Sequence, residues 1–289
     1  MINFFRKQLG YMMTGETSDR SMFIWWGQGS NGKGTVSNLV KMIMCQFYVQ
    51  ASKDVMIKSD KPSSNKGAAT PHLIPLVTAR LGMLSETSVD DKLDDAFVKS
   101  CSGNDPISAR PLYGKQFEFI PRTKLVLQSN YKPKFDATDT AVNDRLKLTP
   151  FLARFTPTGS GDGEAKQDKS FIDSLMGEHL DEVFRWMLQG ALLWYETKSL
   201  VMPTSAQNQM DEYREDQDVI NQFVAQKCST RGGDSLRVEL YQAFKLWCAE
   251  EAITPESASS FYTALIKKGF KQGKSYGVRS FLQLVVIHQ

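Results

Sequence analysis

Short apolar runs separated by longer amphipathic stretches dominate the first 150 positions of the chain. The runs at 21–26, 80–86 and 124–130 are apolar at most positions, which is typical of strands buried on both faces of a sheet. Apolar residues at helical spacing between Thr35 and Tyr48 predict a helix directly after the first strand. Because strands alternate with helices, we predict an α/β fold with a parallel sheet.

The turn between the first strand and that helix has the pattern of a phosphate-binding loop. Its sequence, Gly-Gln-Gly-Ser-Asn-Gly-Lys-Gly-Thr, fits G-x-x-x-x-G-K, with a threonine one place later than the usual hydroxyl. Glycines let successive N–H groups surround an anion, and the helix N-terminus and the lysine add positive charge. We therefore predict an ATP site at Gly27, Gly29, Ser30, Asn31, Gly32, Lys33, Gly34 and Thr35.

Polar residues end the other two apolar runs. Glu86 follows the second run and Asn130 the third, so both are expected at the carboxyl edge of the sheet, near the loop. Glu86 is a candidate to hold a metal or polarise water, and Thr35 a candidate to complete Mg²⁺ coordination. A solvated Glu86 and a turn-forming Asn130 are the alternatives.

Cationic residues outside the loop predict contacts with phosphate groups. Arg145 is a candidate arginine finger for a neighbouring subunit, and pairing with Asp144 is the alternative. A hairpin over 107–119, turning at Gly114-Lys115, would present Lys115 to a DNA backbone. Further candidate DNA contacts, for which a solvated surface is the alternative, are Lys99, Arg110, Lys267, Lys268, Lys271 and Lys274.

Changes in pattern divide the chain into four predicted parts. They are an N-terminal helical segment over 1–20, a P-loop ATPase core over 21–156, a helical segment over 157–216 and a winged-helix-like domain over 217–289. The last rests on two amphipathic helices followed by a glycine-punctuated β-like tail. The polar stretch 58–70 predicts a mobile loop within the core.

Bulk composition limits the remaining possibilities. The net charge of +3 over 289 residues is too small to indicate a nucleic-acid partner by itself. Four scattered cysteines and three histidines predict neither a zinc site nor a disulfide framework and favour a reducing compartment. No apolar run has the length of roughly 20 residues that a membrane span needs. We expect a protein of the cytoplasm, or of the host cytoplasm if it is encoded by a phage or virus, with no membrane partner.

Several motifs together resemble one family. In order along the chain they are 27–35, Leu84-Ser85-Glu86, Ser102 to Gly114, Phe117-Glu118-Phe119 and Gln128 to Pro133. Their order and spacing resemble the superfamily 3 helicases of the phage and plasmid primase type, which also occur in large DNA viruses. The resemblance covers nearly the whole chain.

This resemblance implies an AAA+-type ATPase that assembles as a hexameric ring around single-stranded DNA and unwinds a duplex fork. It makes Lys33 the phosphate lysine, Glu86 the Walker B acid, Asn130 the sensor and Arg145 the finger. Members often have two arginines where this chain has Asp144-Arg145, and Lys-Ser where it has Lys33-Gly34. They often carry a primase or primase–polymerase module, so we expect a piece of a longer protein, with a stand-alone gene as the alternative.

Two other functions fit parts of the pattern. The Gly-Lys-Gly-Thr ending also occurs in nucleotide and nucleoside kinases, but residues 157–200 lack the arginine-rich lid that a kinase predicts. A DNA-binding replication-initiation protein, for which ATP acts only as a switch, is the third possibility.

Overall fold

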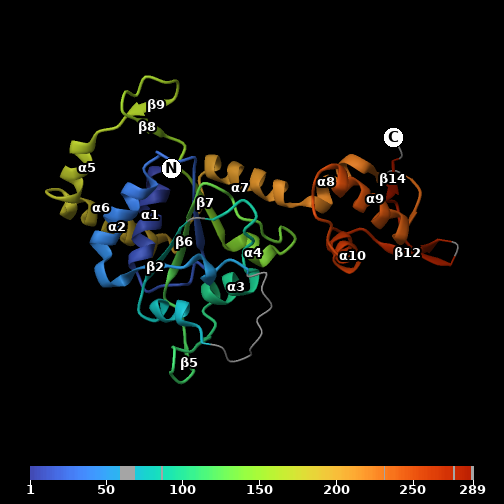
Figure 1. The fold of residues 1–289 in the computed structure, drawn as a ribbon, viewed down its shortest axis with the longest axis horizontal. Coiled ribbons are helices and arrows are strands. Elements are labelled where there is room, and N and C mark those ends of the chain that lie inside the picture. The colour runs from blue at the N-terminus through green and yellow to red at the C-terminus, as the bar shows by residue number, and fades with distance from the viewer. Residues whose placement is uncertain (59–68, 86, 231, 276, 288–289) are drawn as a thin grey trace. The chain divides into compact units, whose positions relative to one another are not determined.

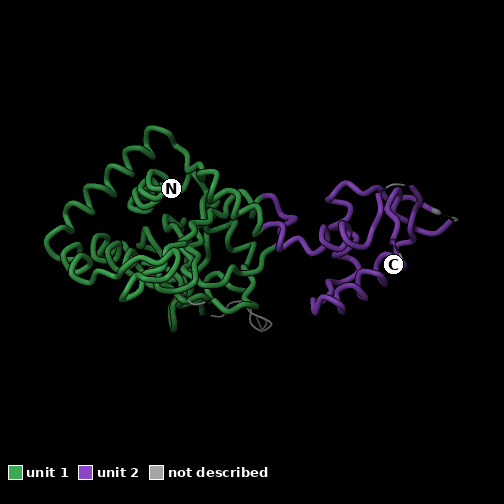
Figure 2. Tube along the Cα trace, turned by 90° about the horizontal axis from the view of Figure 1, so that it is seen from above, with its two compact units in different colours: residues 1–135, 141–213 green, residues 136–140, 214–289 purple. Residues whose placement is uncertain are grey.

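The computed structural model describes residues 1–58, 69–85, 87–230, 232–275 and 277–287. These residues form two compact units, shown in Figure 2. The first unit contains residues 1–135 and 141–213, and the second contains 136–140 and 214–289. The division into four domains stays a prediction.

A five-stranded parallel sheet forms the centre of the first unit, as the alternating pattern predicts (Figure 1). The three expected strands are β1 (Met22–Trp26), β3 (Leu81–Ser85) and β6 (Lys124–Ser129), and β6 lies between the other two. The outer strands are β2 (Tyr48–Ala51) and β7 (Leu146–Pro150), and the full order is β2-β3-β6-β1-β7. All the pairings are parallel, so the carboxyl ends of β3, β6 and β1 meet at one edge.

The helix after the phosphate-binding loop is shorter than predicted. Helix α2 spans Lys33–Met44 and ends before Cys45, whose φ of 48° is left-handed and incompatible with a continuing helix. A single 3-10 turn, Cys45–Phe47, then leads into β2, a strand that the apolar pattern did not predict. Phe47 therefore lies at the surface and not on the buried face of the helix.

Helices α1 (Ile2–Met13) and α6 (Leu180–Thr197) pack at very short range through two glycines. A Cβ atom built on Gly10 would lie 2.0 Å from the backbone nitrogen of Ala191, and one built on Gly190 would lie 1.9 Å from the carbonyl oxygen of Arg6. Only glycine allows this backbone approach. The contact fixes α6 against the N-terminal helix, so 1–20 and the helical region after 157 belong to the same compact unit.

The rest of the first unit consists of short elements around the sheet. Two of them, β4 (Ile107–Ala109) and β5 (Phe117–Phe119), form the expected antiparallel hairpin. The others are 3-10 turns Lys53–Val55 and Pro71–Val77, α3 (Asp95–Gly103), α4 (Thr140–Arg145), β8 (Arg154–Thr156), β9 (Glu164–Lys166), α5 (Lys169–Met176) and α7 (Thr204–Gln217), of which α4 and α7 each cross into the second unit.

The second unit has its own aromatic core. Phe223, Phe244, Trp247 and Phe261 are fully or almost fully buried there, and the rings of Phe244 and Phe261 stack at 4.5 Å. The elements around this core are α8 (Val219–Lys227), β10 (Cys228–Ser229), β11 (Ser235–Leu236), α9 (Arg237–Glu250), α10 (Ala258–Lys267), β12 (Gln272–Ser275), β13 (Val278–Phe281) and β14 (Val285–Val286).

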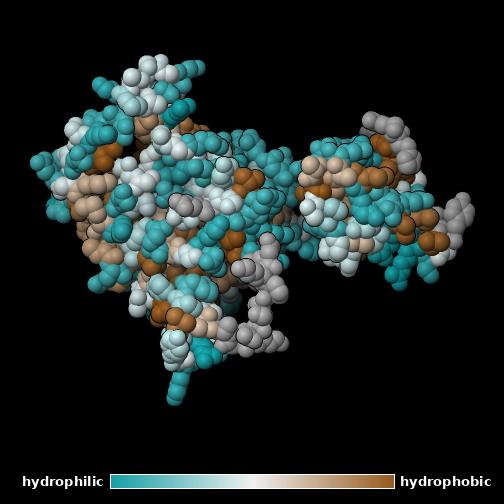
Figure 3. Space-filling view, in the orientation of Figure 1, coloured by the Kyte–Doolittle hydropathy of each residue, from teal (hydrophilic) through white to brown (hydrophobic). Residues whose placement is uncertain are grey.

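Hydrophilic residues cover most of the face drawn in Figure 3, with hydrophobic residues scattered between them. Among the described residues, no helix combines the length and the apolar character that crossing a bilayer requires.

The glycine contact between α1 and α6 gives the first prediction. Gly190→Ala should lower the free energy of unfolding by about 3 kcal/mol or more, because backbone atoms on α1 cannot move aside as a side chain would. Urea unfolding measures the change. Gly34→Ala is the matched control, since a Cβ at Gly34 meets nothing within 4 Å and the change should stay within about 1 kcal/mol. Equal effects of the two substitutions would contradict the packing argument.

Candidate functional site: a phosphate-binding loop at the carboxyl edge of the sheet

The strand, loop and helix around Gly27–Lys33 form as the motif predicts. β1 ends at Trp26 and α2 begins at Lys33, so the loop lies directly at the helix N-terminus. Gly29, Ser30 and Gly32 have φ values of 56°, 46° and 87°, which turn the backbone tightly between the two elements. This is the local geometry in which N–H groups and the helix dipole favour an anion.

The ammonium group of Lys33 lies inside the loop. Its Nζ donates to the carbonyl oxygen of Gly27 at 2.5 Å, to Oδ1 of Asn31 at 3.3 Å and to Oδ1 of Asn130 at 3.2 Å. Lys33 is 5% exposed, and burial lowers its pKa below the ordinary lysine value. A buried cation held by neutral oxygens is stabilised by an incoming anion, so these residues fit the phosphates of a nucleotide.

Asn130 reaches Lys33 because its backbone is held at the tip of β6. The indole Nε1 of Trp26, the last residue of β1, donates to the carbonyl oxygen of Asn130 at 3.1 Å. The neighbouring register pairs Trp26 with Ser129. Two adjacent strand ends therefore bring Lys33 and Asn130 together, as expected from parallel strands.

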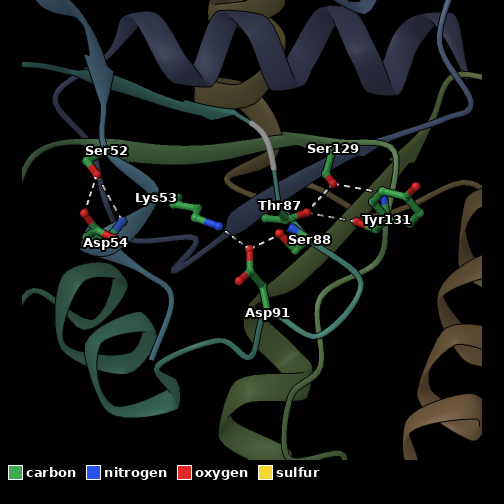
Figure 4. A network of polar contacts seen from close by, with 8 residues as sticks. All are labelled: Ser52, Lys53, Asp54, Thr87, Ser88, Asp91, Ser129 and Tyr131. Carbon is green, nitrogen blue, oxygen red and sulfur yellow. Dashed lines mark hydrogen bonds and ion pairs between the residues drawn. The ribbon is translucent and has the colours of Figure 1, made fainter. Parts of the chain in front are cut away.

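A second polar network lies where β3 and β6 end, and Figure 4 shows it. The hydroxyl groups of Thr87 and Ser129 are hydrogen-bonded, and Ser129 Oγ accepts from the backbone N–H of Tyr131 at 2.9 Å. Asp91 pairs with Lys53 at 2.9 Å. Although burial raises the pKa of Asp91, hydrogen bonds from Lys53 and the Ser88 N–H and the Lys53 charge bring it below its usual value. Glu86 lies outside the described residues, so its expected position at this edge stays a prediction.

Thr35 and Gly34 occupy the first turn of α2. Thr35 is half-buried, while Gly34 is exposed and has open space where a side chain would lie. The usual serine or threonine could therefore be accommodated at position 34 without a clash. Within the described part of the chain, no group of three or more His, Cys, Asp or Glu is placed to hold a metal ion. The Mg²⁺ roles of Thr35 and Glu86 stay predictions.

The segment after β7 also holds the loop, which the sequence reasoning missed. Phe151 accepts a hydrogen bond from Nδ2 of Asn31 at 3.1 Å, and its own N–H donates to the carbonyl oxygen of Trp26 at 2.7 Å. Phe155 N–H donates to the carbonyl oxygen of Ser30 at 2.7 Å. No local motif marks these contacts; the only signal is that residues after a strand paired with β1 must pass this edge.

Arg145 ends α4 and is engaged within its own chain. Its Nε donates to Oγ of Ser102 at 3.0 Å, and its Nη1 donates to the carbonyl oxygen of Ala141 at 2.6 Å. The side chain is half-buried. A finger role requires the guanidinium group to leave these partners, and that role stays a prediction.

The hairpin turns at a different place from the one predicted. Ala109 pairs with Phe117, and the Gly114 N–H donates to the Pro111 carbonyl at 3.2 Å, so Leu112 and Tyr113 form the tip in place of Gly114-Lys115. Tyr113 has a φ of 60° and is fully exposed. Hydrophobic and hydrophilic residues lie together where this hairpin projects, at the bottom of Figure 3.

The three predicted cations near the hairpin differ in their surroundings. Lys115 is exposed beside the tip. Arg110 instead supports the turn, because its Nε donates to the Gly114 carbonyl at 3.2 Å. Lys99 is half-buried on α3 and already interacts within the chain.

The C-terminal lysines also divide into two groups. Lys268 is ion-paired with Asp218, and each side chain is 18% exposed, so this lysine stabilises the second unit and is not a free surface cation. Lys267 donates to Oγ1 of Thr138 at 3.4 Å. Lys271 and Lys274 are exposed, and Lys274 lies opposite Arg279 in the β12–β13 hairpin.

Comparison with known proteins identifies viral relatives. The chain is 27% identical over 251 residues to "Putative helicase L207/L206" of Acanthamoeba polyphaga mimivirus, which covers 83% of this chain and 26% of that protein. It is 27% identical over 262 residues to "Putative helicase 022R" of Frog virus 3, covering 84% and 26%. "Primase D5" of Fowlpox virus is 23% identical over 185 residues, covering 63% and 23%. The chain spans about a quarter of the length of these relatives. No family model matches it.

Solved structures show the same fold. The apo structure of the NrS-1 C-terminal region (305–718) has a TM-score of 0.53 with 10% identity, covering 99% of this chain and 71% of that one. At this identity the likeness concerns the fold alone. Together with the viral helicase and primase relatives, it confirms the resemblance that the motifs indicated.

The second prediction concerns Asn31, which connects Lys33 to Phe151. Asn31→Ala should lower the free energy of unfolding by about 1–3 kcal/mol, because it removes the side-chain donor to the part-buried Phe151 carbonyl and one of the three acceptors of the Lys33 ammonium. Chemical denaturation measures this. Asn38→Ala, at an exposed position of α2, is the control and should change stability little. An unchanged free energy of unfolding in Asn31→Ala would contradict a stabilising role of Asn31 in the loop.

Proposed function

We infer from its homology to viral helicase and primase proteins that the chain is the ATPase motor of a replicative DNA helicase. The structural observation that carries this inference is the convergence of Lys33, Asn31 and Asn130 at the phosphate-binding loop. The loop and Lys33 give the site its affinity for an anion, and Asn130 provides a neutral polar group at the end of the neighbouring strand. Such a group senses a phosphate without repelling it.

In this proposal each polar residue at the carboxyl edge of the sheet has a defined role. The ammonium of Lys33 binds the β- and γ-phosphates, and the loop N–H groups surround them. Thr35 and Glu86 would hold Mg²⁺, and Glu86 would orient the attacking water. ATP supplies the phosphoanhydride bond whose hydrolysis provides the free energy for movement. Asn130 would then transmit the loss of the γ-phosphate to β6.

The hairpin is the proposed contact with single-stranded DNA. It lies between β3 and β6 in sequence, so a shift of either strand end can be passed to its tip. The exposed Tyr113 offers a ring for a base, and Lys115 offers a charge for a phosphate. We therefore add Tyr113 to Lys115 in the proposed contact of the hairpin with DNA.

We further propose a ring of identical subunits, hexameric by analogy with the family, in which Arg145 reaches the neighbour's nucleotide after leaving Ser102. The second unit would be a winged helix, with β12–β13 as the wing. Its exposed Lys271 and Lys274 would then contact DNA. A covalently linked primase or primase–polymerase module elsewhere in a longer protein is part of the same proposal.

The third prediction tests the motor. The wild-type protein should hydrolyse ATP, and single-stranded DNA should increase the rate, whereas Lys33→Ala should lower turnover at least about 100-fold because the phosphates lose their cation. A phosphate-release assay with and without oligothymidylate measures both. Phosphorylation of a nucleoside would support a kinase instead. ATP binding without measurable turnover would support a nucleotide switch.

The fourth prediction separates the hairpin from the ATP site. Tyr113→Ala and Lys115→Ala should each keep basal ATP hydrolysis while weakening stimulation by DNA, with about 1–3 kcal/mol lost for the aromatic contact. The measurement is the DNA concentration for half-maximal stimulation. Lys166→Ala, an exposed lysine on β9, is the control. Unchanged stimulation in both hairpin variants would remove the hairpin from the DNA path.

A further inference from the structure

A large groove lies at the amino edge of the sheet, the edge opposite the phosphate-binding loop. Its volume is about 980 Å³, and its walls come from the segment after α1, the residues before β3 and β6, the end of α3 and one face of α6. This volume is at the upper end of the range for pockets that enclose one small ligand. The residues that matter for its chemistry are Arg20, Arg80, Arg122, Ile120, Leu188 and Tyr195.

Positive charge dominates the groove. Three arginines line it, against the single carboxylate of Glu16. Arg80 is partly committed, since its Nη1 donates to the Met13 carbonyl at 3.0 Å. Arg20 and Arg122 are exposed, and among the described residues neither guanidinium group has a hydrogen-bond or ion-pair partner. Two unpaired guanidinium groups in one groove are suited to two anionic groups.

A buried lysine connects two segments that line the groove. Lys124, the first residue of β6, is 2% exposed and donates to the carbonyl oxygens of Thr14 and Arg122, the latter at 3.2 Å. Burial and the charge of Arg80 lower the pKa of Lys124 to about 7. On the far side, Thr17 Oγ1 donates to Oδ1 of Asn104 at 3.0 Å. The segment after α1 is thus held at Thr14 and at Thr17, which keeps this wall of the groove in place.

Apolar side chains line the groove together with the arginines. Ile120, Leu188 and Tyr195 are 53%, 43% and 43% exposed. Leu188 and Tyr195 lie on α6, and Ile120 directly follows β5 at the base of the hairpin. Lys198 Nζ lies 4.1 Å from the centre of the Tyr195 ring and adds another cation beside the apolar wall. A ligand that carries separated negative charges and flat apolar groups would match this arrangement.

We propose that this groove binds a segment of single-stranded nucleic acid, with Arg20 and Arg122 contacting phosphates and the apolar wall contacting bases. This inference rests on the proposed function, in which the hairpin contacts single-stranded DNA. Asn104 and Ile120 line the groove and flank the hairpin in sequence, so a DNA strand bound at the hairpin would continue into the groove. The combination of arginines with exposed apolar and aromatic side chains favours a nucleic-acid strand over an acidic peptide, which offers no bases.

The test is the salt dependence of binding to labelled oligothymidylate, followed by fluorescence anisotropy. The double variant Arg20→Gln/Arg122→Gln should bind about 10-fold more weakly, and its slope of log affinity against log salt should be shallower by about 1.4, since each lost phosphate contact on a single strand removes about 0.7. The control Lys41→Gln/Arg185→Gln removes the same charge from exposed positions outside the groove and should keep the wild-type slope. ATP hydrolysis without DNA should be unchanged in both variants.

The outcomes separate this inference from the proposed function. A wild-type protein that binds no single-stranded DNA overturns both. If the wild-type protein binds DNA but the slope of the double variant matches that of the control, only the proposal that the groove binds DNA is overturned. Binding of polyglutamate that depends on Arg20 and Arg122, without a change in the DNA slope, also overturns it. If the double variant does not fold, each single variant gives the same test with a slope change of about 0.7.

Discussion

The phosphate-binding edge of the sheet depends on one buried positive charge, the ammonium group of Lys33. Among the described residues, the partners of the Lys33 ammonium are neutral oxygens, from Gly27, Asn31 and Asn130. Removing an ammonium from water is costly unless it is paired, and neutral acceptors compensate only in part. Binding of a phosphate would stabilise the ammonium group, and this free energy can drive a change in the segments that hold the three oxygens. These are the tip of β6, the loop itself and the segment after β7.

Strand β6 connects the two edges of the sheet. β6 begins at Lys124, which bonds to Thr14 and Arg122 in the walls of the groove, and ends beside Asn130, which contacts Lys33. The hairpin precedes β6 in the chain, and Ile120 at its base lines the groove. In the proposed mechanism, β6 therefore links the nucleotide at one edge of the sheet to a DNA strand at the other. A small change at the phosphate-binding loop could move the hairpin through this strand.

The sequence was informative where a residue's role is local. The run Met22–Trp26 and the glycines of the loop follow from local sterics, so their positions were predictable. Helix α2 begins at Lys33, two residues before the predicted Thr35. The end of α2 was not predictable, because Cys45 adopts a left-handed backbone that residue type alone does not indicate. The contacts of Phe151 and Phe155 with the loop, and the ion pair of Lys268 with Asp218, join residues far apart in sequence and depend on tertiary packing. The hairpin was predicted, but its tip was displaced to Leu112-Tyr113 because seven residues, not two, connect its strands.

Calorimetric titration with a non-hydrolysable ATP analogue tests the central claim most directly. Since burial lowers the pKa of Lys33 and a bound phosphate would raise it, wild-type protein should bind the analogue with net proton uptake at alkaline pH. Lys33→Met, with a side chain of similar length and no charge, should lose both the binding and the proton uptake. Comparable affinity in the two proteins, or wild-type binding without that proton uptake, would contradict the account.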